Sequence, residues 1–494
     1  MNSDYIKLAQ ALFPEVTLSP EDLERRYPPR NLPPTSEVTR LGPSPTGFIH
    51  LGNLYSALAN ERLAHSTGGV FFLRVEDTDL KRQTPGAVEA IINSLRYFKI
   101  NLDQGALIAP KPGQIDYGPY FQSQRKDIYH VLAKNLVERG LAYPCFCSEE
   151  KLEEIRAKQT EQKLNTGYYG AFAACREMDL DKVLEKIASS QPRVLRLRSK
   201  GQSGLTFFFS DQIMGQVELP ENFKDIVLLK SDGIPTYHFA HAVDDHLMRT
   251  TTVVRGVEWL SSVPVHRELF NFLNFNPPKY AHTAQLMKLD GGSKRKLSKR
   301  EDPESSLDYY RQEGYHPKAT RVYLMTILNS NFEDWRNENP SLNLEDFPFE
   351  LSKMGNSGIL FDIQKLNDVS RNVFGDFTAE QIANFFRDWL DEFYSQQTKT
   401  YFEDEQRLIQ IIRLNQGLME NRKRKDIVCA SQLKELLSFY FDQSFIPVFE
   451  PLKNFKRAVD ILKDYLQSMG QTNDSVSWFD NLKSIGQRYN YFPK

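Results

Sequence analysis

The segment Glu37–Val75 constrains the fold more than any other part of the chain. Glu37–Leu41 has the pattern of a short strand, and Gly42–Gly47 is a turn rich in proline, serine and glycine. Leu51–His65 carries apolar residues at helical spacing, and Val70–Val75 is an apolar run typical of a buried strand. A strand, a helix and a second strand with short connections predict a βαβ unit, which has parallel strands and a right-handed crossover.

Strand and helix patterns return at Asp225–Lys230, at Thr250–Arg255 and in the residues up to Leu289. The stretch between the two blocks is charged and rich in helical patterns. An insertion that splits one sheet explains this order best. From about Phe374 onward the pattern is almost entirely helical, and it includes a capping box at Thr378. We therefore predict an α/β chain with a Rossmann-like parallel sheet, an inserted domain and a helical C-terminal half.

The bulk composition limits the class of protein. With 494 residues, 40% hydrophobic and 26% charged, the chain is expected to form three to five globular domains. There are 62 basic and 64 acidic residues, so any surface that binds nucleic acid must be a local patch. The four cysteines fit a reducing cytoplasm, and we expect a cytoplasmic protein with no secretory signal. No apolar run approaches the roughly 20 residues of a membrane helix, so no membrane partner is expected.

The strongest chemical signal is the string Arg40-Leu-Gly-Pro-Ser-Pro-Thr-Gly-Phe-Ile-His50-Leu-Gly52-Asn53. It joins a strand to a helix N-terminus through a glycine-bearing turn, and such a terminus offers N–H groups and a positive dipole end to phosphate. His50 and Asn53 lie three residues apart and face the same side of the first helical turn. A lone histidine here would more simply be a solvent-facing residue, but the whole string argues against that alternative.

The second signal is Ser293–Arg300, with five cations in eight residues after the pair Gly291-Gly292. A basic run of this kind is usually a solvated loop. A lysine-rich loop on a glycine hinge could also close over a triphosphate and neutralise the charge that develops as pyrophosphate leaves.

Together the two strings resemble the signature motifs of class I aminoacyl-tRNA synthetases, the His-Ile-Gly-His and Lys-Met-Ser-Lys-Ser types. They stand here as His50-Leu-Gly-Asn53 and Lys296-Leu-Ser-Lys-Arg300, about 250 residues apart. The chain is most similar to the bacterial glutamyl-tRNA synthetases, over roughly residues 37–370 and more weakly to the end. This likeness rests on the strings Pro43–Gly47, Leu73–Asp79, Gln122–Arg125, Pro235–His238, Val243–His246 and Arg255–Trp259.

The resemblance implies a division of the chain. The expected parts are an N-terminal helical extension and linker (1–36), the first half of the Rossmann catalytic domain (37–114), an inserted acceptor-stem-binding domain (115–222), the second half of the catalytic domain (223–290), a stem-contact domain with the lysine-rich loop (291–372) and an all-α anticodon-binding domain (373–494).

The resemblance also implies roles for individual residues. Glutamate has two carboxylates and one ammonium, so its site needs cations for the former and an anion for the latter. The implied glutamate-binding residues are Arg40, Ser44, Glu76, Tyr237 and Arg255, with Arg40 assigned to the side-chain carboxylate and Glu76 to the ammonium. The implied ATP-binding residues are Gly47, His50, Gly52, Asn53, Glu258, Trp259, Leu286 and Lys299. The implied catalytic residues are His50, Asn53, Lys296 and Lys299.

The implied reaction has two steps: glutamate attacks the α-phosphorus of ATP, and the glutamyl group then passes to the 3′-terminal adenosine of tRNA(Glu). Mg²⁺ would accompany ATP. The implied enzyme is a monomer, and a non-discriminating enzyme that also charges tRNA(Gln) stays open as an alternative. Glutaminyl-tRNA synthetases, the nearest rival, typically differ at Pro43–Gly47 and Glu76–Asp79, where this chain has the glutamyl form. The length of this chain argues against the short paralogues that modify tRNA.

Three further features are weaker. A zinc site in the insertion of some relatives resembles the set Cys145, Cys147 and Cys175. The position two residues after Cys175 is Glu177, not a fourth cysteine or histidine, so we expect reduced thiols rather than zinc. Tyr168 or Tyr169 is the alternative fourth ligand. Asn421–Lys425 is either a contact for the tRNA backbone or a solvated loop. Relatives usually continue beyond the point where this chain stops, so the anticodon domain is expected to be truncated or naturally short.

Overall fold

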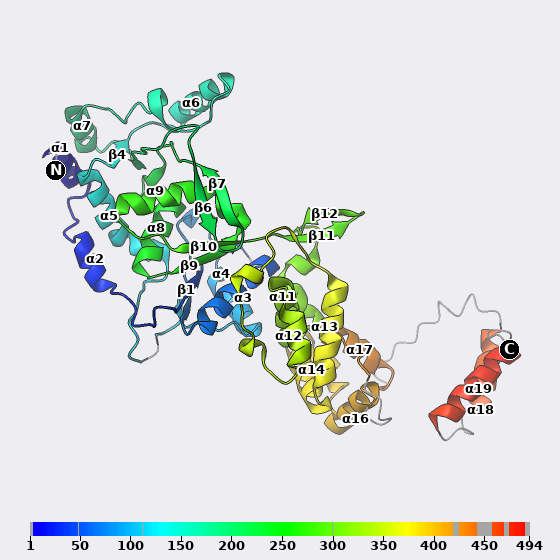
Figure 1. Ribbon diagram of the computed structural model, residues 1–494. Coiled ribbons are helices and arrows are strands. Elements are labelled where there is room, and N and C mark those ends of the chain that lie inside the picture. The colour runs from blue at the N-terminus through cyan, green and yellow to red at the C-terminus, as the bar shows by residue number, and fades with distance from the viewer. Residues whose placement is uncertain are drawn as a thin grey trace.

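The computed structural model describes residues 3–47, 49–110, 112–298, 300–417, 424–441, 457–468 and 474–489. A parallel sheet lies at its centre, the insertion lies beyond one side of that sheet, and the helices α10–α17 lie beyond the other (Figure 1). The described part of the chain has no helix with both the length and the apolar character that a bilayer-spanning segment requires.

The central sheet is assembled from two distant blocks of sequence. Its strands are β1 (Val38–Leu41), β2 (Val70–Leu73), β3 (Gln104–Gly105), β9 (Thr252–Gly256) and β10 (Lys279–Thr283). All pairings are parallel, in the orders β1-β2-β3 and β10-β9. Strand β9 begins beside β1, where the Thr251 N–H donates to the Val38 carbonyl at 2.9 Å. The predicted βαβ unit is confirmed, and an insertion does separate the two halves of the sheet.

The residues of β1 and β2 are buried on both faces, as is usual for parallel strands covered by helices. The helices of this region are α3 (Leu51–Ser66), α4 (Ala87–Tyr97), α5 (Lys126–Glu138), α8 (Tyr237–Leu247) and α9 (Val263–Leu273). Helix α3 packs on β1, β2 and β9. Gly69 ends the connection after α3, and a Cβ at this position would collide with the Glu37 carbonyl, so only glycine allows β2 to approach β1 here.

The N-terminal residues form two helices, α1 (Ser3–Leu12) and α2 (Pro20–Arg26). Ser19 caps α2, and Pro20 is its first residue. Helix α1 packs on α5 and α7, and Tyr27 after α2 is buried, with its hydroxyl donating to the Gly118 carbonyl at 2.9 Å. The N-terminal extension is therefore part of the packed structure.

The insertion contains a separate antiparallel sheet and a hairpin. Its elements are β4 (Ala142–Cys145), α6 (Glu149–Glu161), α7 (Leu180–Ala188), β5 (Val194–Leu197), β8 (Val227–Leu229) and the hairpin β6 (Thr206–Asp211) with β7 (Gly215–Pro220). The sheet order is β4-β5-β8. The strand expected near Asp225–Lys230 thus forms as β8, but it joins the insertion and not the parallel sheet. The turn of the hairpin lies on β10, where the Gln212 N–H donates to the Tyr280 carbonyl at 2.8 Å.

The remaining elements are mostly helical. They are β11 (Leu286–Asp290), β12 (Ser293–Lys296), α10 (Leu307–Glu313), α11 (Pro317–Leu328), α12 (Phe332–Glu338), β13 (Ile359–Leu360), α13 (Ile363–Asp376), α14 (Ala379–Phe393), α15 (Gln396–Thr400), α16 (Glu405–Asn415), α17 (Ala430–Ser438), α18 (Ala458–Ser468) and α19 (Ser475–Arg488). Short 3-10 helices are η1 (Leu80–Arg82), η2 (Gln122–Arg125), η3 (Gly170–Phe172), η4 (Val257–Ser262), η5 (Pro303–Ser305), η6 (Leu344–Asp346) and η7 (Leu351–Lys353).

Helix α14 opens with the predicted capping box: the Gln381 N–H donates to the Thr378 hydroxyl, and the Thr378 N–H donates to the Gln381 side chain. Its apolar stripe, which includes Ile382, Phe386 and Leu390, forms a second core with α16 and α17. The predicted helical half of the chain is therefore confirmed for the described residues.

His316 at the start of α11 gives a prediction about acid stability. Its Nδ1 accepts from the Lys318 N–H at 3.1 Å, and its ring lies 4.7 Å from that of Phe377. Burial, with help from Lys318, lowers the pKa of His316 to about 4. As the pH falls from 6.5 the unfolded state therefore binds a proton first, and stability decreases down to about pH 4. At 1.36 kcal/mol per unit, this histidine accounts for up to about 3 kcal/mol.

His316→Asn preserves a helix cap but cannot titrate in this range. Urea unfolding at pH 7 and pH 4.5 should show a loss of stability about 2–3 kcal/mol smaller in the variant than in the parent protein. Equal losses in the two proteins would contradict this account of His316.

Candidate active site

A cavity of about 630 Å³ opens at the carboxyl ends of β1 and β9. Ligands bind at this edge in open parallel sheets. Its lining includes most of the residues singled out from the sequence: Arg40, Ser44, His50, Gly52, Asn53, Glu76, Tyr237, Arg255, Glu258, Trp259, Leu286 and Lys296. Gly47 is not among the lining residues of the described chain and lies in the turn between β1 and α3. Lys299 lies outside the described residues.

Arg40 on β1 lines the cavity, and Asp245 anchors its Nε. Its Nε donates to Asp245 Oδ1 at 3.1 Å, and Arg74 Nη1 donates to the same oxygen at 2.7 Å. Burial alone would raise the pKa of Asp245, but Arg40 and Arg74, helped by His241, hold it well below its usual range. A fixed anion therefore holds the Nε side of Arg40, a residue that lines the cavity.

Glu76 supplies the carboxylate of the cavity. Arg74 Nη2 donates to Glu76 Oε1 at 3.0 Å. Burial raises the pKa of Glu76, and Arg74 and Arg40 offset part of this effect. A Cβ on Gly42 would collide with the Glu76 carboxylate, so the glycine after β1 makes room for this acid. The arrangement places one anion beside two guanidiniums, which suits a ligand that carries both charges.

Arg255 at the end of β9 is held on nearly every side. Its Nε donates to His282 Nε2 at 3.1 Å and its Nη1 to the Tyr237 hydroxyl at 3.0 Å. Its Nη2 donates to the Trp259 carbonyl at 3.2 Å and to the Ser262 hydroxyl at 3.1 Å. Four of the five guanidinium N–H groups thus have partners among the described residues, which leaves one N–H on Nη1 for a ligand in the cavity.

One side of the cavity is formed by the N-terminus of α3. His50 is the N-cap, and its N–H donates to Asn53 Oδ1 at 3.2 Å, while the Asn53 N–H donates to the His50 carbonyl at 2.8 Å. The predicted pair therefore lies together on the first turn of the helix, where the helix dipole favours an anion.

The lysine-rich segment begins with β12, which pairs with β11 beside the cavity, and its cations are not equivalent. Lys296 lines the cavity. Arg295 instead pairs with Asp290 at 2.7 Å and with Asp302 at 2.6 Å, and the Ser298 N–H donates to Asp302 at 2.8 Å. Asp302 thus fastens the loop, a role that counting cations in the sequence does not reveal.

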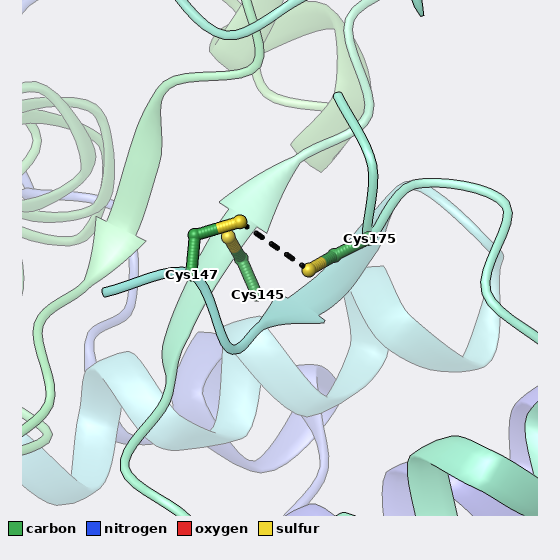
Figure 2. A group of neighbouring side chains, drawn as sticks. All are labelled: Cys145, Cys147 and Cys175. Carbon is green, nitrogen blue, oxygen red and sulfur yellow. Dashed lines mark hydrogen bonds between the residues drawn. The ribbon is translucent and has the colours of Figure 1, made fainter. Parts of the chain in front are cut away.

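The three cysteines of the insertion lie together (Figure 2). Their sulfur atoms all lie within 4.8 Å of one another, and Cys147 Sγ is 3.7 Å from Cys175 Sγ. The Tyr168 hydroxyl lies 3.3 Å from Cys147 Sγ and accepts from the Cys175 N–H at 3.0 Å. The Cys175 thiol and Tyr168 lower the pKa of the Cys145 thiol. Three sulfur atoms and one phenol oxygen thus lie together, which equals the number of ligands of a structural zinc ion, while burial and the neighbouring thiols raise the pKa of Tyr168.

Comparison with known proteins agrees with this geometry. The profile of the family described as tRNA synthetases class I (E and Q), catalytic domain, matches residues 37–337. The chain is 51% identical to the glutamate–tRNA ligase of Acetivibrio thermocellus over 494 residues, which cover 99% of this chain and 90% of that protein. It is 40% identical to the enzyme of the same name from Clostridium perfringens strain 13, over 99% of this chain and 90% of that protein.

A solved structure is also similar. The crystal structure of a glutamate tRNA ligase from Elizabethkingia meningosepticum in complex with its amino acid has a TM-score of 0.70 and 26% sequence identity. The match covers 92% of this chain and 90% of that one. The fold, the contents of the cavity and the extent of these matches agree, and the chain belongs to the class I tRNA synthetases of the glutamate and glutamine family.

Proposed function

We propose that this protein ligates L-glutamate to tRNA(Glu) with ATP, in the cytoplasm and as a monomer. The observation that carries the proposal is the cavity in which Arg40, Glu76 and Arg255 lie beside the N-terminus of α3. Two cations and one anion match the charges of glutamate, and the helix end matches a phosphate. The similar proteins named above carry the same activity in their names.

The residues act by binding and orienting the reactants. Arg40 holds the side-chain carboxylate, Glu76 holds the ammonium with Ser44 beside it, and Arg255 with Tyr237 completes the amino-acid site. His50 and Asn53 hold phosphate oxygens, and the α-carboxylate attacks the α-phosphorus in line, so that pyrophosphate leaves toward Lys296 and Lys299. Gly47, Gly52, Glu258, Trp259 and Leu286 frame ATP. Mg²⁺ accompanies the nucleotide and neutralises phosphate charge.

In the second step the 2′-hydroxyl of the terminal adenosine attacks the glutamyl carbonyl, and AMP leaves. No covalent enzyme intermediate is needed, because the enzyme supplies position and charge stabilisation. The assignment of Lys299 rests on the sequence motif, since this residue lies outside the described part of the chain.

Exchange of labelled pyrophosphate into ATP tests the function. Exchange should require glutamate, should not be supported by glutamine, and should be stronger with tRNA present. Exchange with glutamine, or exchange that needs no amino acid, would refute the proposal. The same assay with and without tRNA separates this enzyme from the short tRNA-modifying paralogues.

The choice of tRNA is a second question. Within the predicted basic patch Asn421–Lys425, residues 421–423 lie outside the described residues. Lys425 donates to Asn372 Oδ1 at 2.7 Å, and Arg424 pairs with Asp426 at 2.6 Å. These two cations already have protein partners, so we propose that they shape the domain more than they bind the tRNA backbone. Charging of purified tRNA(Glu) and tRNA(Gln) distinguishes a discriminating enzyme from the non-discriminating alternative.

We also propose that Cys145, Cys147, Cys175 and Tyr168 hold one zinc ion, whereas the sequence alone favoured reduced thiols. The protein should contain about one zinc per chain by elemental analysis. Cys147→Ser should lower the zinc content severalfold, while Cys429→Ser, which changes a cysteine distant in sequence from the cluster, should not. Equal zinc content in the two variants, or none in the parent protein, would contradict this site.

A further inference from the structure

We infer that His282 and Asp211 are positioning residues of the glutamate site, because together they hold the Arg255 guanidinium in one orientation. Neither residue lines the described cavity. His282 lies on β10 directly opposite Arg255 on β9, and Asp211 ends β6 in the inserted hairpin. The inference rests on the proposed role of Arg255 in binding glutamate.

The hydrogen bonds fix the proton of His282. An arginine has only donors, so His282 Nε2, 3.1 Å from Arg255 Nε, must accept and carries no proton. The proton of the neutral ring is then on Nδ1, which donates to Asp211 Oδ2 at 2.7 Å. The direction of both bonds is set by Asp211 at one end and Arg255 at the other.

Asp211 is itself held rigidly. Its Oδ1 accepts from the Ile213 and Met214 N–H groups at 2.9 Å each, and the His282 backbone N–H donates to the carboxylate at 3.2 Å. The side chains of Asp211 and His282 are fully buried. Burial opposes ionisation, but His282 and the backbone amides hold the pKa of Asp211 below its usual value. The Asp211 carboxylate is therefore a permanent acceptor for the proton on His282 Nδ1.

The Nε side of Arg255 depends on the hydrogen bond to His282. Tyr237, Trp259 and Ser262 accept from its two terminal nitrogens, but only His282 accepts from Nε among the described residues. Without that bond the guanidinium would leave a buried N–H unpaired and would rotate to satisfy it. The N–H that we assign to glutamate would then point away from the cavity, so glutamate affinity depends on His282.

Two substitutions of His282 form a matched test. Glutamine reaches as far as Nε2 and can still accept from Arg255, whereas asparagine reaches only as far as Nδ1 and cannot. In pyrophosphate exchange with tRNA present, His282→Asn should raise the KM for glutamate at least tenfold. His282→Gln should stay within about threefold of the parent protein, and neither should change the KM for ATP more than twofold.

Asp211→Asn is the second test. The new amide group can turn its N–H groups toward His282, which then takes the other tautomer and sets its Nε2–H against the Arg255 Nε–H. It can instead turn them toward the backbone amides of the hairpin, where donor then faces donor. The KM for glutamate should again rise at least tenfold. Equal KM values for all of these variants and the parent protein, or equal rises in His282→Asn and His282→Gln, would overturn the inference.

A combined variant separates this inference from the role of Arg255. If His282 acts through Arg255, adding His282→Asn to Arg255→Ala should not raise the KM for glutamate further. A further rise would overturn the inference. An Arg255→Ala protein with unchanged KM for glutamate would instead refute the proposed role of Arg255, while the pyrophosphate exchange itself would continue to test the proposed function.

Discussion

Glu76→Gln should reduce kcat/KM for glutamate by about 30- to 1000-fold, the equivalent of about 2–4 kcal/mol. The substitution keeps the shape of the side chain and an oxygen for Arg74, which donates to Glu76 Oε1 at 3.0 Å. It removes the negative charge and presents an N–H donor to the ammonium of glutamate, which has only donors of its own. Pyrophosphate exchange measured over a range of glutamate concentrations gives the value.

Asp79→Asn is the matched control for this prediction. Asp79 belongs to the same sequence motif but is paired with Arg82 at the surface, where about half of the side chain is exposed. Its substitution should change kcat/KM less than twofold. The KM for ATP should be unchanged in both variants. If Glu76→Gln behaved like Asp79→Asn, Glu76 would not hold the ammonium.

Asp245→Asn should lower the free energy of unfolding by about 3–5 kcal/mol, because it leaves buried guanidinium charge without its anion. Asp245 Oδ1 accepts from Arg40 Nε, Arg74 Nη1 and the Thr250 hydroxyl. The side chains of Asp245 and Arg74 are completely buried. Urea unfolding followed by fluorescence measures the loss, and activity should fall as well because Arg40 loses its anchor.

A surface ion pair provides the comparison. On α13, Arg371 Nη1 lies 2.6 Å from Asp368 Oδ1. The Asp368 side chain is 65% exposed and the Arg371 side chain is 38% exposed. Asp368→Asn should therefore cost less than about 1 kcal/mol. Should the two aspartate variants unfold at the same urea concentration, the buried anion would not be what stabilises this site.

The residues that bear the site were predictable where a local motif carries their chemistry. Arg40 and His50 belong to one continuous string, in which a strand, a turn and a helix start must occur in order. The turn Gly42–Gly47 separates the strand from the helix in the sequence, and β1 and α3 form within a residue of the expected bounds. The capping box at Thr378 was predictable for the same reason, since all its bonds are local.

The residues that orient the site were not predictable in this way. Asp245 lies in a string that marked the family likeness, yet its partner Arg40 is 205 positions away. Asp211 and His282 are likewise 71 positions apart. Arg295 was counted among the cations for phosphate, but its charge is paired with Asp290 on the neighbouring strand β11 and with Asp302 after the loop. Such roles depend on which strands become neighbours, and periodicity within one segment does not specify that.

The interrupted sheet has a consequence for synthesis of the protein. Strand β1 is complete at Leu41, but its neighbour β9 begins only at Thr252. A ribosome must therefore translate the whole insertion before the second edge of β1 can be covered. Until then the buried face of β1 depends on β2 and α3 alone. A chain truncated just before Thr252 should thus be protease-sensitive and unable to retain glutamate, and one truncated after Thr283 is the shortest that could hold both arginines of the site in place.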